Sequence, residues 1–269
     1  MTATGAASLG AVPPPGRLFG RRYLHLGRHR VPSYVVLLEV GCVLGTYVGV
    51  WAAAADGLDE VRFVVGTALL LVPALVGSRL WFVLGHRDEF RRDPSRVWRR
   101  AEGGSALYGG LVLSAAVSVP VLALLDLPYW RFWDAAALTM LVGLIPTRLG
   151  CAMNGCCTGR ATEGALGVRM PDVEGRWERR YPSPLLEAGY VGLILVAVLA
   201  VAVVAGPQVP FAGARFLAVV GAYAAGRIAL GATRGSGARS AWGNAVTSVA
   251  ILLAVAAALA VGRAGDLGW

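Results

Sequence analysis

Seven apolar runs, each of about 20 residues, constrain the fold of this chain more than any other feature. A helix needs about 20 predominantly apolar residues to cross the hydrocarbon core of a bilayer. The runs are too long and too continuously apolar for the strands of a membrane barrel, which alternate apolar and polar residues. The sequence therefore predicts an all-α fold, a polytopic membrane helical bundle with about seven transmembrane helices. The predicted spans are residues 34–55, 62–85, 106–125, 132–148, 185–205, 211–231 and 243–262, of which the fourth is the shortest.

The composition favours a membrane protein over a soluble one. Charged residues make up 15% of the chain, whereas ordinary soluble domains carry about 25%. The basic residues are all arginine, and the formal net charge is +9. Because most of these arginines lie in the connections between apolar runs, they favour contact with anionic lipid headgroups, and no nucleic-acid partner is expected.

The apolar runs divide the chain into three parts. Residues 1–33 are expected to form a basic N-terminal tail, residues 34–262 the transmembrane domain, and residues 263–269 a short C-terminal tail. The tail begins with small residues and prolines and has no apolar core before Val31, so it does not resemble a cleavable signal peptide. We therefore expect the first span to direct the chain to the membrane.

The arginines also bear on the orientation of the chain in the membrane. With seven spans, the N-terminal tail and the connections at 86–105, 149–184 and 232–242 fall on one side. That side carries most of the arginines, and the positive-inside rule would place it in the cytoplasm.

Three arginines lie within predicted spans or at their ends, namely Arg79, Arg148 and Arg227. A central arginine costs about 2.5–3.5 kcal/mol on the membrane-insertion scale, so each needs a physical reason. One interpretation is that the guanidinium groups snorkel to the interface. The other is that they face the interior of the bundle and grip a lipid phosphate through paired hydrogen bonds.

Two glycine-rich segments are candidates for the same site. Gly103–Gly110 opens the third span, where paired glycines let backbone amides approach a ligand beside Tyr108; a glycine hinge with an interfacial tyrosine is the alternative. Arg148–Arg160 is rich in glycine and polar residues, and irregular backbone is tolerated at membrane depth only where protein buries it or it lines a cavity. Glu187, about one turn into the fifth span, is a further candidate, although an acid there also complements the helix dipole.

The cysteines Cys151, Cys156 and Cys157 fall within one short stretch of sequence. They could be small apolar packing residues, metal ligands, or nucleophiles activated by the neighbouring arginines. No fourth metal ligand is apparent, because the histidines of the chain are distant in sequence. We therefore expect no metal site and no cofactor, while the packing and nucleophile interpretations stay open.

Five segments of the chain resemble motifs of the bacterial prolipoprotein diacylglyceryl transferase family, and they occur in the same order as in that family. Each motif alone is weak, but five in the right order on a seven-span frame are fairly specific. The resemblance covers about residues 70–235. The segments are GSRLWFVLG at 77–85, GGSALYGGL at 103–111, TRLGCAMNGCCTGR at 147–160, RYPSPLLEA at 180–188 and YAAGRIALGATR at 223–234.

This resemblance implies a transferase of the bacterial plasma membrane that uses phosphatidylglycerol as donor. It also implies an N-terminus outside the cell, whereas the arginine count places it inside, so the orientation stays open. Members of the family move the diacylglyceryl group of phosphatidylglycerol to the thiol of a lipobox cysteine, in the signal-peptide region of a prolipoprotein, and glycerol phosphate leaves. By matching position, Arg148 and Arg227 would stabilise the charge on the leaving phosphate, and Tyr108 would be a third catalytic residue. The residues expected to bind the lipid are Arg79, Gly104, Gly109, Gly110, Asn154, Gly155, Gly159 and Glu187.

The chain also departs from the family pattern. Tyr108 stands where the motif has histidine, and a phenol is a poor base at neutral pH. The other departures are Cys151 for asparagine, Cys156 for glutamate, Pro184 for glutamine, Leu186 for tyrosine and Gly231 for an acid. Three alternatives therefore stay open: a diverged enzyme with another acceptor, a non-catalytic phospholipid-binding protein, and a small transporter, although no internal repeat of the usual transporter kind is evident.

Overall fold

The computed structural model describes residues 19–85, 87–90, 107–172, 174–204, 210–234 and 238–263. Within these ranges the chain forms seven helices of 18 residues or more, one helix of four residues and two β-hairpins. The helices are α1 Ser33–Ala55, α2 Glu60–Gly85, α3 Arg87–Phe90, α4 Leu107–Leu124, α5 Tyr129–Asn154, α6 Ser183–Val204, α7 Ala214–Gly231 and α8 Ala238–Arg263. The strands are β1 Tyr23–Leu26, β2 His29–Pro32, β3 Val168–Pro171 and β4 Trp177–Arg180.

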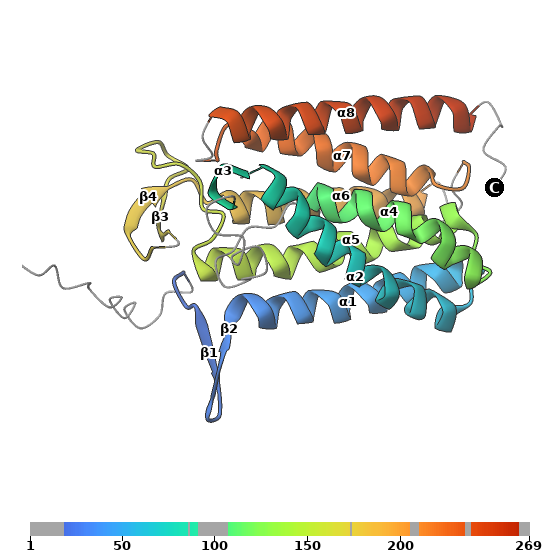
Figure 1. Ribbon diagram of the computed structural model, residues 1–269, viewed down its shortest axis with the longest axis horizontal. Helices are drawn as coiled ribbons and strands as arrows, with labels where there is room; N and C mark the ends of the chain where they lie inside the picture. Colours follow the sequence, from blue (N-terminus) through green and yellow to red (C-terminus); the bar gives the residue numbers. More distant parts are fainter. Residues whose placement is uncertain are drawn as a thin grey trace, which may run out of the picture.

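The long helices lie side by side with their axes roughly aligned (Figure 1). Among the described residues, five helices (α1, α2, α5, α6 and α7) are long and apolar enough to cross a membrane, and shorter apolar stretches of α4 and α8 accompany them. This arrangement confirms the prediction of a polytopic bundle with about seven spans. The chain is therefore a multi-pass membrane protein.

The fourth span was predicted at residues 132–148, and its C-terminal end was wrong. Helix α5 continues to Asn154, so Arg148 lies inside a helix and not at the start of an irregular connection. The extension is favoured because Cys151, Ala152 and Met153 are small or apolar residues that α5 buries. The helix ends where Gly155 takes a left-handed conformation, with φ of 75°, which glycine adopts at little cost.

Helix α5 lies at the centre of the bundle and packs against α1, α6 and α7. Its contact with α1 depends on glycine, because a Cβ atom at Gly41 would lie 2.5 Å from the carbonyl oxygen of Gly143. The same is true of Gly45, whose Cβ would lie 2.5 Å from the carbonyl oxygen of Thr139. The close approach of the two backbones fixes the position of α5 and of the side chains at its C-terminal end.

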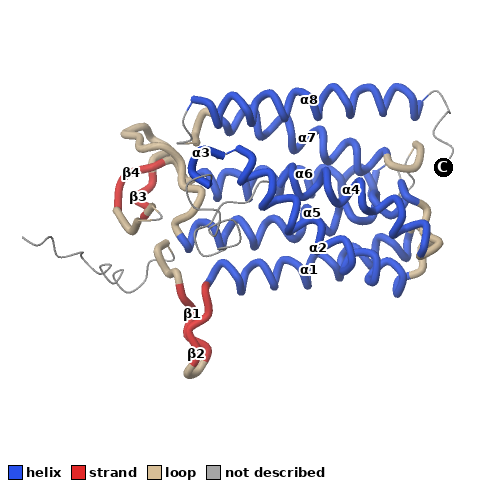
Figure 2. Tube along the Cα trace, viewed as in Figure 1, coloured by secondary structure: helices blue, strands red, loops and turns tan. Residues whose placement is uncertain are grey.

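Two β-hairpins, β1–β2 and β3–β4, were absent from the all-α prediction and lie at the same end of the bundle (Figure 2). β1–β2 occupies part of the segment that was expected to be a basic tail, whose residues 1–18 lie outside the described residues. In β3–β4, Asp172 accepts hydrogen bonds from the backbone N–H groups of Glu174 and Arg176 and pairs with the Arg176 and Arg180 guanidinium groups. Burial raises the pKa of Asp172, but the hydrogen bonds from Arg176 and Glu174 outweigh it and hold this pKa below its ordinary value.

The N-terminus of α7 is anchored by a buried carboxylate on α5. Asp134 accepts hydrogen bonds from the backbone N–H groups of Gly213, at 2.7 Å, and Phe216, at 2.8 Å. These bonds satisfy donors that have no partner inside the helix. An ion pair between Arg215 and Asp56, with 2.9 Å between nitrogen and oxygen, adds a second tie at the same end. These contacts fix the register of α7 against α5. They thereby position Arg227, which lies further along α7, for the site.

Candidate active site

The carboxylate of Glu187 lies at the centre of a buried cluster of polar side chains, and its side chain is 2% exposed. Arg148 Nη2 lies 2.8 Å from Glu187 Oε1, and Arg227 Nη1 lies 3.5 Å from the same oxygen. Arg234 Nη2 contacts the other oxygen, Oε2. The hydroxyl of Tyr223 donates to Oε1 over 2.5 Å and accepts from Arg148 over 3.3 Å. We call these five residues the Glu187 cluster.

Three helices and one connection bring the Glu187 cluster together. Arg148 comes from α5 and Glu187 from the N-terminal part of α6, where these two helices pack together. Tyr223 and Arg227 come from α7, and residues four apart on a helix share a face. Arg234 follows the end of α7 and is not part of any helix.

The segment that carries Arg234 is held by backbone contacts with the connection after α5. Gly159 and Arg234 form an antiparallel bridge, and the N–H of Arg160 donates to the carbonyl of Thr233 over 3.0 Å. The hydroxyl groups of Ser183 and Thr233 are 3.0 Å apart and share a hydrogen bond. Gly159 has no room for a side chain, because a Cβ atom there would meet the Thr233 carbonyl. Its role is therefore to let Arg234 approach Glu187.

The charge of the Glu187 cluster does not balance. Three guanidinium groups surround one carboxylate, which leaves two positive charges in a place where the arginine side chains are only 12% to 21% exposed. The buried Nε of Arg148 has no hydrogen-bond partner among the described residues. Buried charge is unfavourable unless it is paired, so this excess of positive charge favours a further anion at the cluster. Guanidinium groups bind phosphate through paired, charge-assisted hydrogen bonds.

Tyr108 borders the cluster but forms no hydrogen bond with its members within the described part of the chain. Its ring lies edge-to-face against that of Tyr223, with 6.4 Å between ring centroids. Its hydroxyl is buried and lies 2.9 Å from the hydroxyl of Ser248 on α8. The phenol is therefore oriented toward α8, and no carboxylate or imidazole that could activate it contacts it within the described part of the chain.

The other residues predicted to bind lipid are not all brought to the cluster. Arg79 is buried, and its guanidinium lies over the rings of Phe82 and Phe90, at 5.6 Å and 5.5 Å from their centroids. Gly109 and Gly110 lie in the tight contact between α4 and α2, where added Cβ atoms would meet backbone oxygens of α2. The structure gives these glycines a packing role, and Gly104 lies outside the described residues.

Asn154, Gly155 and the three cysteines do lie beside the cluster, at the C-terminal end of α5. Asn154 is the last residue of α5, and Gly155 caps the helix. Gly155 has no room for a side chain, because an added Cβ atom would meet the carbonyl oxygens of Pro171 and Asp172. All four cysteines of the chain are free thiols. The sulfur atoms of Cys151, Cys156 and Cys157 lie within 4.8 Å of one another. The three cysteines that follow Arg148 in the sequence therefore form a compact group of thiols.

Sequence reasoning missed two members of the cluster, Tyr223 and Arg234. Both belong to the segment 223–234, of which only Arg227 was proposed as functional. A signal was present, because Tyr223 precedes Arg227 by four residues and so shares its helix face. For Arg234 no such signal exists, since its approach to Glu187 depends on the bridge to Gly159.

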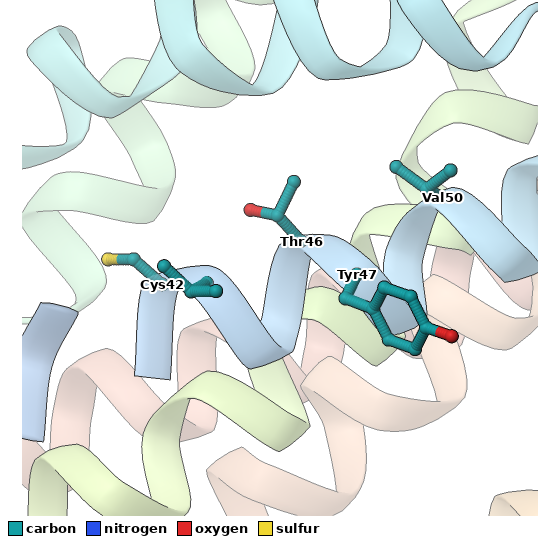
Figure 3. A pocket seen from close by; sticks show the side chains of 5 residues that line it. Cys42, Thr46, Tyr47 and Val50 are labelled. Atoms are coloured by element: carbon teal, nitrogen blue, oxygen red, sulfur yellow. The ribbon is translucent and has the colours of Figure 1, made fainter. Parts of the chain in front are cut away.

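A separate hollow of about 390 Å³ lies on the surface of α1 and is lined by Cys42, Val43, Thr46, Tyr47 and Val50. Figure 3 shows these side chains along one face of the helix. Val43 and Tyr47 are largely exposed, as expected for a surface that faces lipid. None of the lining residues belongs to the Glu187 cluster, so the hollow is separate from it.

The fold and the cluster together define a multi-pass membrane protein with a buried, guanidinium-rich cluster at one end of its helix bundle. The chain belongs to the prolipoprotein diacylglyceryl transferase family, whose family model matches residues 21–263. This match confirms the resemblance that its sequence motifs indicate.

Three bacterial relatives show how far the similarity extends, and each is named a phosphatidylglycerol–prolipoprotein diacylglyceryl transferase. The protein of Rhodopirellula baltica is 29% identical over 150 residues, which are 52% of this chain but only 30% of that protein. The protein of Bacillus cereus is 27% identical over 203 residues, or 71% of this chain and 73% of that protein. The protein of Deinococcus radiodurans is 30% identical over 179 residues, or 62% of this chain and 53% of that protein.

Proposed function

We propose that this protein is a transferase of the bacterial plasma membrane that uses phosphatidylglycerol as donor and moves its diacylglyceryl group to the thiol of a prolipoprotein lipobox cysteine. Family membership supports the reaction class, and the names of the relatives supply the donor and the acceptor. The observation that carries the proposal is the buried Glu187 cluster, with three arginines around one carboxylate.

The chemistry of the cluster suits the departure of a phosphate. In the reaction, the acceptor sulfur attacks a glycerol carbon of the lipid, the carbon–oxygen bond to phosphate breaks, and glycerol phosphate leaves. Negative charge grows on the leaving phosphate, so fixed guanidinium groups bind the transition state more tightly than the lipid itself. Arg148, Arg227 and Arg234 would hold the phosphate oxygens, and Glu187 would keep the guanidinium groups in place while the site is empty.

A second candidate function is phospholipid binding without catalysis, or transfer to a different acceptor. The orientation of Tyr108 favours this alternative, because its hydroxyl pairs with Ser248 and no activating group contacts it among the described residues. Without a base, a thiol acceptor would depend on its own ionisation. The two functions would share the same anion site and differ in whether the diacylglyceryl group passes to a lipobox thiol.

Incubation of the purified full chain with phosphatidylglycerol and a lipobox-cysteine peptide tests the proposal. We expect mass spectrometry to detect the diacylglyceryl-peptide and free glycerol phosphate. In Arg148→Ala the rate should fall by about 10²–10³, the effect of removing one preorganised donor. Arg131→Ala is the matched control, because Arg131 is an exposed arginine near the opposite end of the same helix. Equal rates in Arg148→Ala and Arg131→Ala would contradict the role of Arg148, and bound lipid without product would favour the second function.

A further inference from the structure

The proposed transfer needs an acceptor thiolate, and no base for that purpose is evident in the Glu187 cluster. Glu187 is occupied by three guanidinium groups and a phenol. The hydroxyl of Tyr108 pairs with Ser248, and no carboxylate or imidazole contacts it among the described residues. The groups beside the cluster that remain unexplained are the thiols of Cys151, Cys156 and Cys157.

The backbone gathers these three thiols around one point. Cys151 lies on the last turns of α5, and the chain then folds back through Gly155 and Cys157, with φ of 75° and 61°. A left-handed conformation is uncommon for a residue other than glycine and is usually maintained by its surroundings. Cys156 directs its thiol to the carbonyl oxygen of Cys151, with sulfur and oxygen 3.7 Å apart. Cys151 is buried, Cys156 is partly buried and Cys157 is exposed. A ligand can therefore reach the three thiols from the side of Cys157.

The distances fit a tetrahedral metal site with three protein ligands. The sulfur atoms lie within 4.8 Å of one another, and zinc–sulfur bonds of about 2.3 Å would place them about 3.8 Å apart. Small side-chain rotations would close that difference. The sequence indicated no metal because a fourth ligand was lacking, but a zinc site that acts on substrates has three protein ligands and keeps its fourth position open.

We propose that Cys151, Cys156 and Cys157 bind one zinc ion, and that its open fourth position takes the sulfur of the acceptor cysteine as a thiolate. The zinc site follows from the three cysteines alone, whereas the role of its fourth position rests on the proposed transferase function. Thiolate ligands favour zinc over hard cations such as magnesium or calcium. A thiol that coordinates zinc is deprotonated outright, so the metal replaces the missing base.

The surrounding charges favour such a site. Zinc with three thiolates carries one negative charge, and coordination of the acceptor thiolate adds another. The guanidinium groups of Arg148 and Arg234 lie close enough to Cys157 to act on it electrostatically. Arg148 also precedes Cys151 by three residues on α5, and side chains at that spacing share a helix face. The arginines that would hold the lipid phosphate therefore adjoin the proposed metal, which brings acceptor sulfur and donor lipid together.

The step conserves atoms and charge. The acceptor thiol loses its proton to water as its sulfur binds zinc. The coordinated sulfur then attacks the glycerol carbon of phosphatidylglycerol, a carbon–sulfur bond forms, and the carbon–oxygen bond to phosphate breaks. Glycerol phosphate leaves with the electron pair of that bond beside the arginines. The thioether product is neutral and a weak ligand, so it dissociates from zinc.

Metal content tests the site without any activity measurement. The full chain, purified in detergent under reducing conditions from cells supplied with zinc, should contain about one zinc per chain. Cys42→Ser, which changes the remaining cysteine of the chain, on α1, should retain the metal. The double variant Cys151→Ser/Cys157→Ser should lose it. If the double variant fails to fold, the single variant Cys157→Ser, at the exposed thiol, should release zinc to a chelator faster than the unchanged protein.

Cobalt substitution tests the open position. Cobalt(II) bound to three thiolates absorbs through charge-transfer bands, and a fourth sulfur ligand changes those bands and the visible spectrum. We expect the spectrum to change when a lipobox-cysteine peptide is added and to stay constant with a peptide that carries serine instead. A wild-type protein that retains no zinc, or a double variant that retains as much as the wild type, would overturn the zinc site. An unchanged cobalt spectrum would overturn the acceptor role.

The zinc inference and the proposed function can fail separately. Zinc that binds through the three cysteines, in a protein that never consumes phosphatidylglycerol, would keep the metal site and contradict the transferase. Diacylglyceryl transfer at full rate by zinc-free protein would keep the transferase and contradict the metal.

Discussion

Glu187 shows how one buried acid can organise a cluster of positively charged side chains. Its carboxylate is 2% exposed and contacts Arg148, Arg227 and Arg234, which would repel one another without it. The sequence predicted Arg148, Arg227 and Glu187 as candidates, because charge within or at the end of an apolar span is costly and because the family motifs include these positions. Arg234 was not predicted as a site residue because it follows the end of a span, where arginines are common and need no special explanation.

Replacement of Glu187 by glutamine should expose the role of its charge. We expect Glu187→Gln to lose about 3–5 kcal/mol of stability, because three guanidinium groups then stay buried without a carboxylate. Added phosphatidylglycerol should stabilise this variant more than the wild type, because the lipid phosphate supplies the missing negative charge. Thermal unfolding in micelles with and without the lipid measures both effects. Glu39→Gln, at an exposed position on α1, is the control; equal lipid stabilisation in all three proteins would contradict this role.

The helices could be predicted from sequence to within a few residues, whereas the hairpins could not. Bilayer thickness sets the length of a spanning helix, so hydropathy finds both its existence and its approximate ends. The end of α5 was misplaced because a buried arginine resembles a helix terminus when its partner Glu187 is unknown. The strands of β3–β4 are four residues long and carry no periodic signal, and their turn depends on Asp172 and its arginine partners.

The β3–β4 hairpin should loosen in acid. Hydrogen bonds hold the pKa of Asp172 below its ordinary value, although burial acts in the opposite direction. Its contribution to stability is therefore complete above the unfolded-state value of about 3.9 and is lost as the pH falls through the lower folded-state value. Cleavage by an acid protease measures this: Asp172→Asn should be cut faster than wild type near pH 5, and the difference should vanish in stronger acid. Equal cleavage of both proteins near pH 5 would contradict the prediction.

The β1–β2 and β3–β4 hairpins and the Glu187 cluster lie at one end of the bundle (Figure 1). This placement bears on the orientation of the protein in the membrane. Arginines are abundant at this end, and that abundance alone would place it in the cytoplasm. Five of these arginines are held in ion pairs within the protein, since three surround Glu187 and two pair with Asp172. Arginines that serve the site and the hairpin contribute less to the usual charge rule than free loop arginines would.

We therefore predict that the hairpin end faces outward, as the family resemblance implies, and that the C-terminus lies in the cytoplasm. An odd number of spans places the two ends of the transmembrane domain on opposite sides of the membrane. A green fluorescent protein fused to the C-terminus should fluoresce, and an alkaline phosphatase at the same position should be inactive. The reverse pattern would place the Glu187 cluster at the cytoplasmic face.

The binding of phosphatidylglycerol to the purified chain shows whether the Glu187 cluster binds a lipid phosphate. We predict that Arg234→Ala weakens this binding by about tenfold or more, because a hydrogen bond to a charged group contributes about 1.5–3 kcal/mol. Arg131→Ala, at an exposed position far from the cluster, should bind the lipid as the wild type does. Equal affinity of Arg234→Ala and the wild type for phosphatidylglycerol would contradict lipid binding at the cluster.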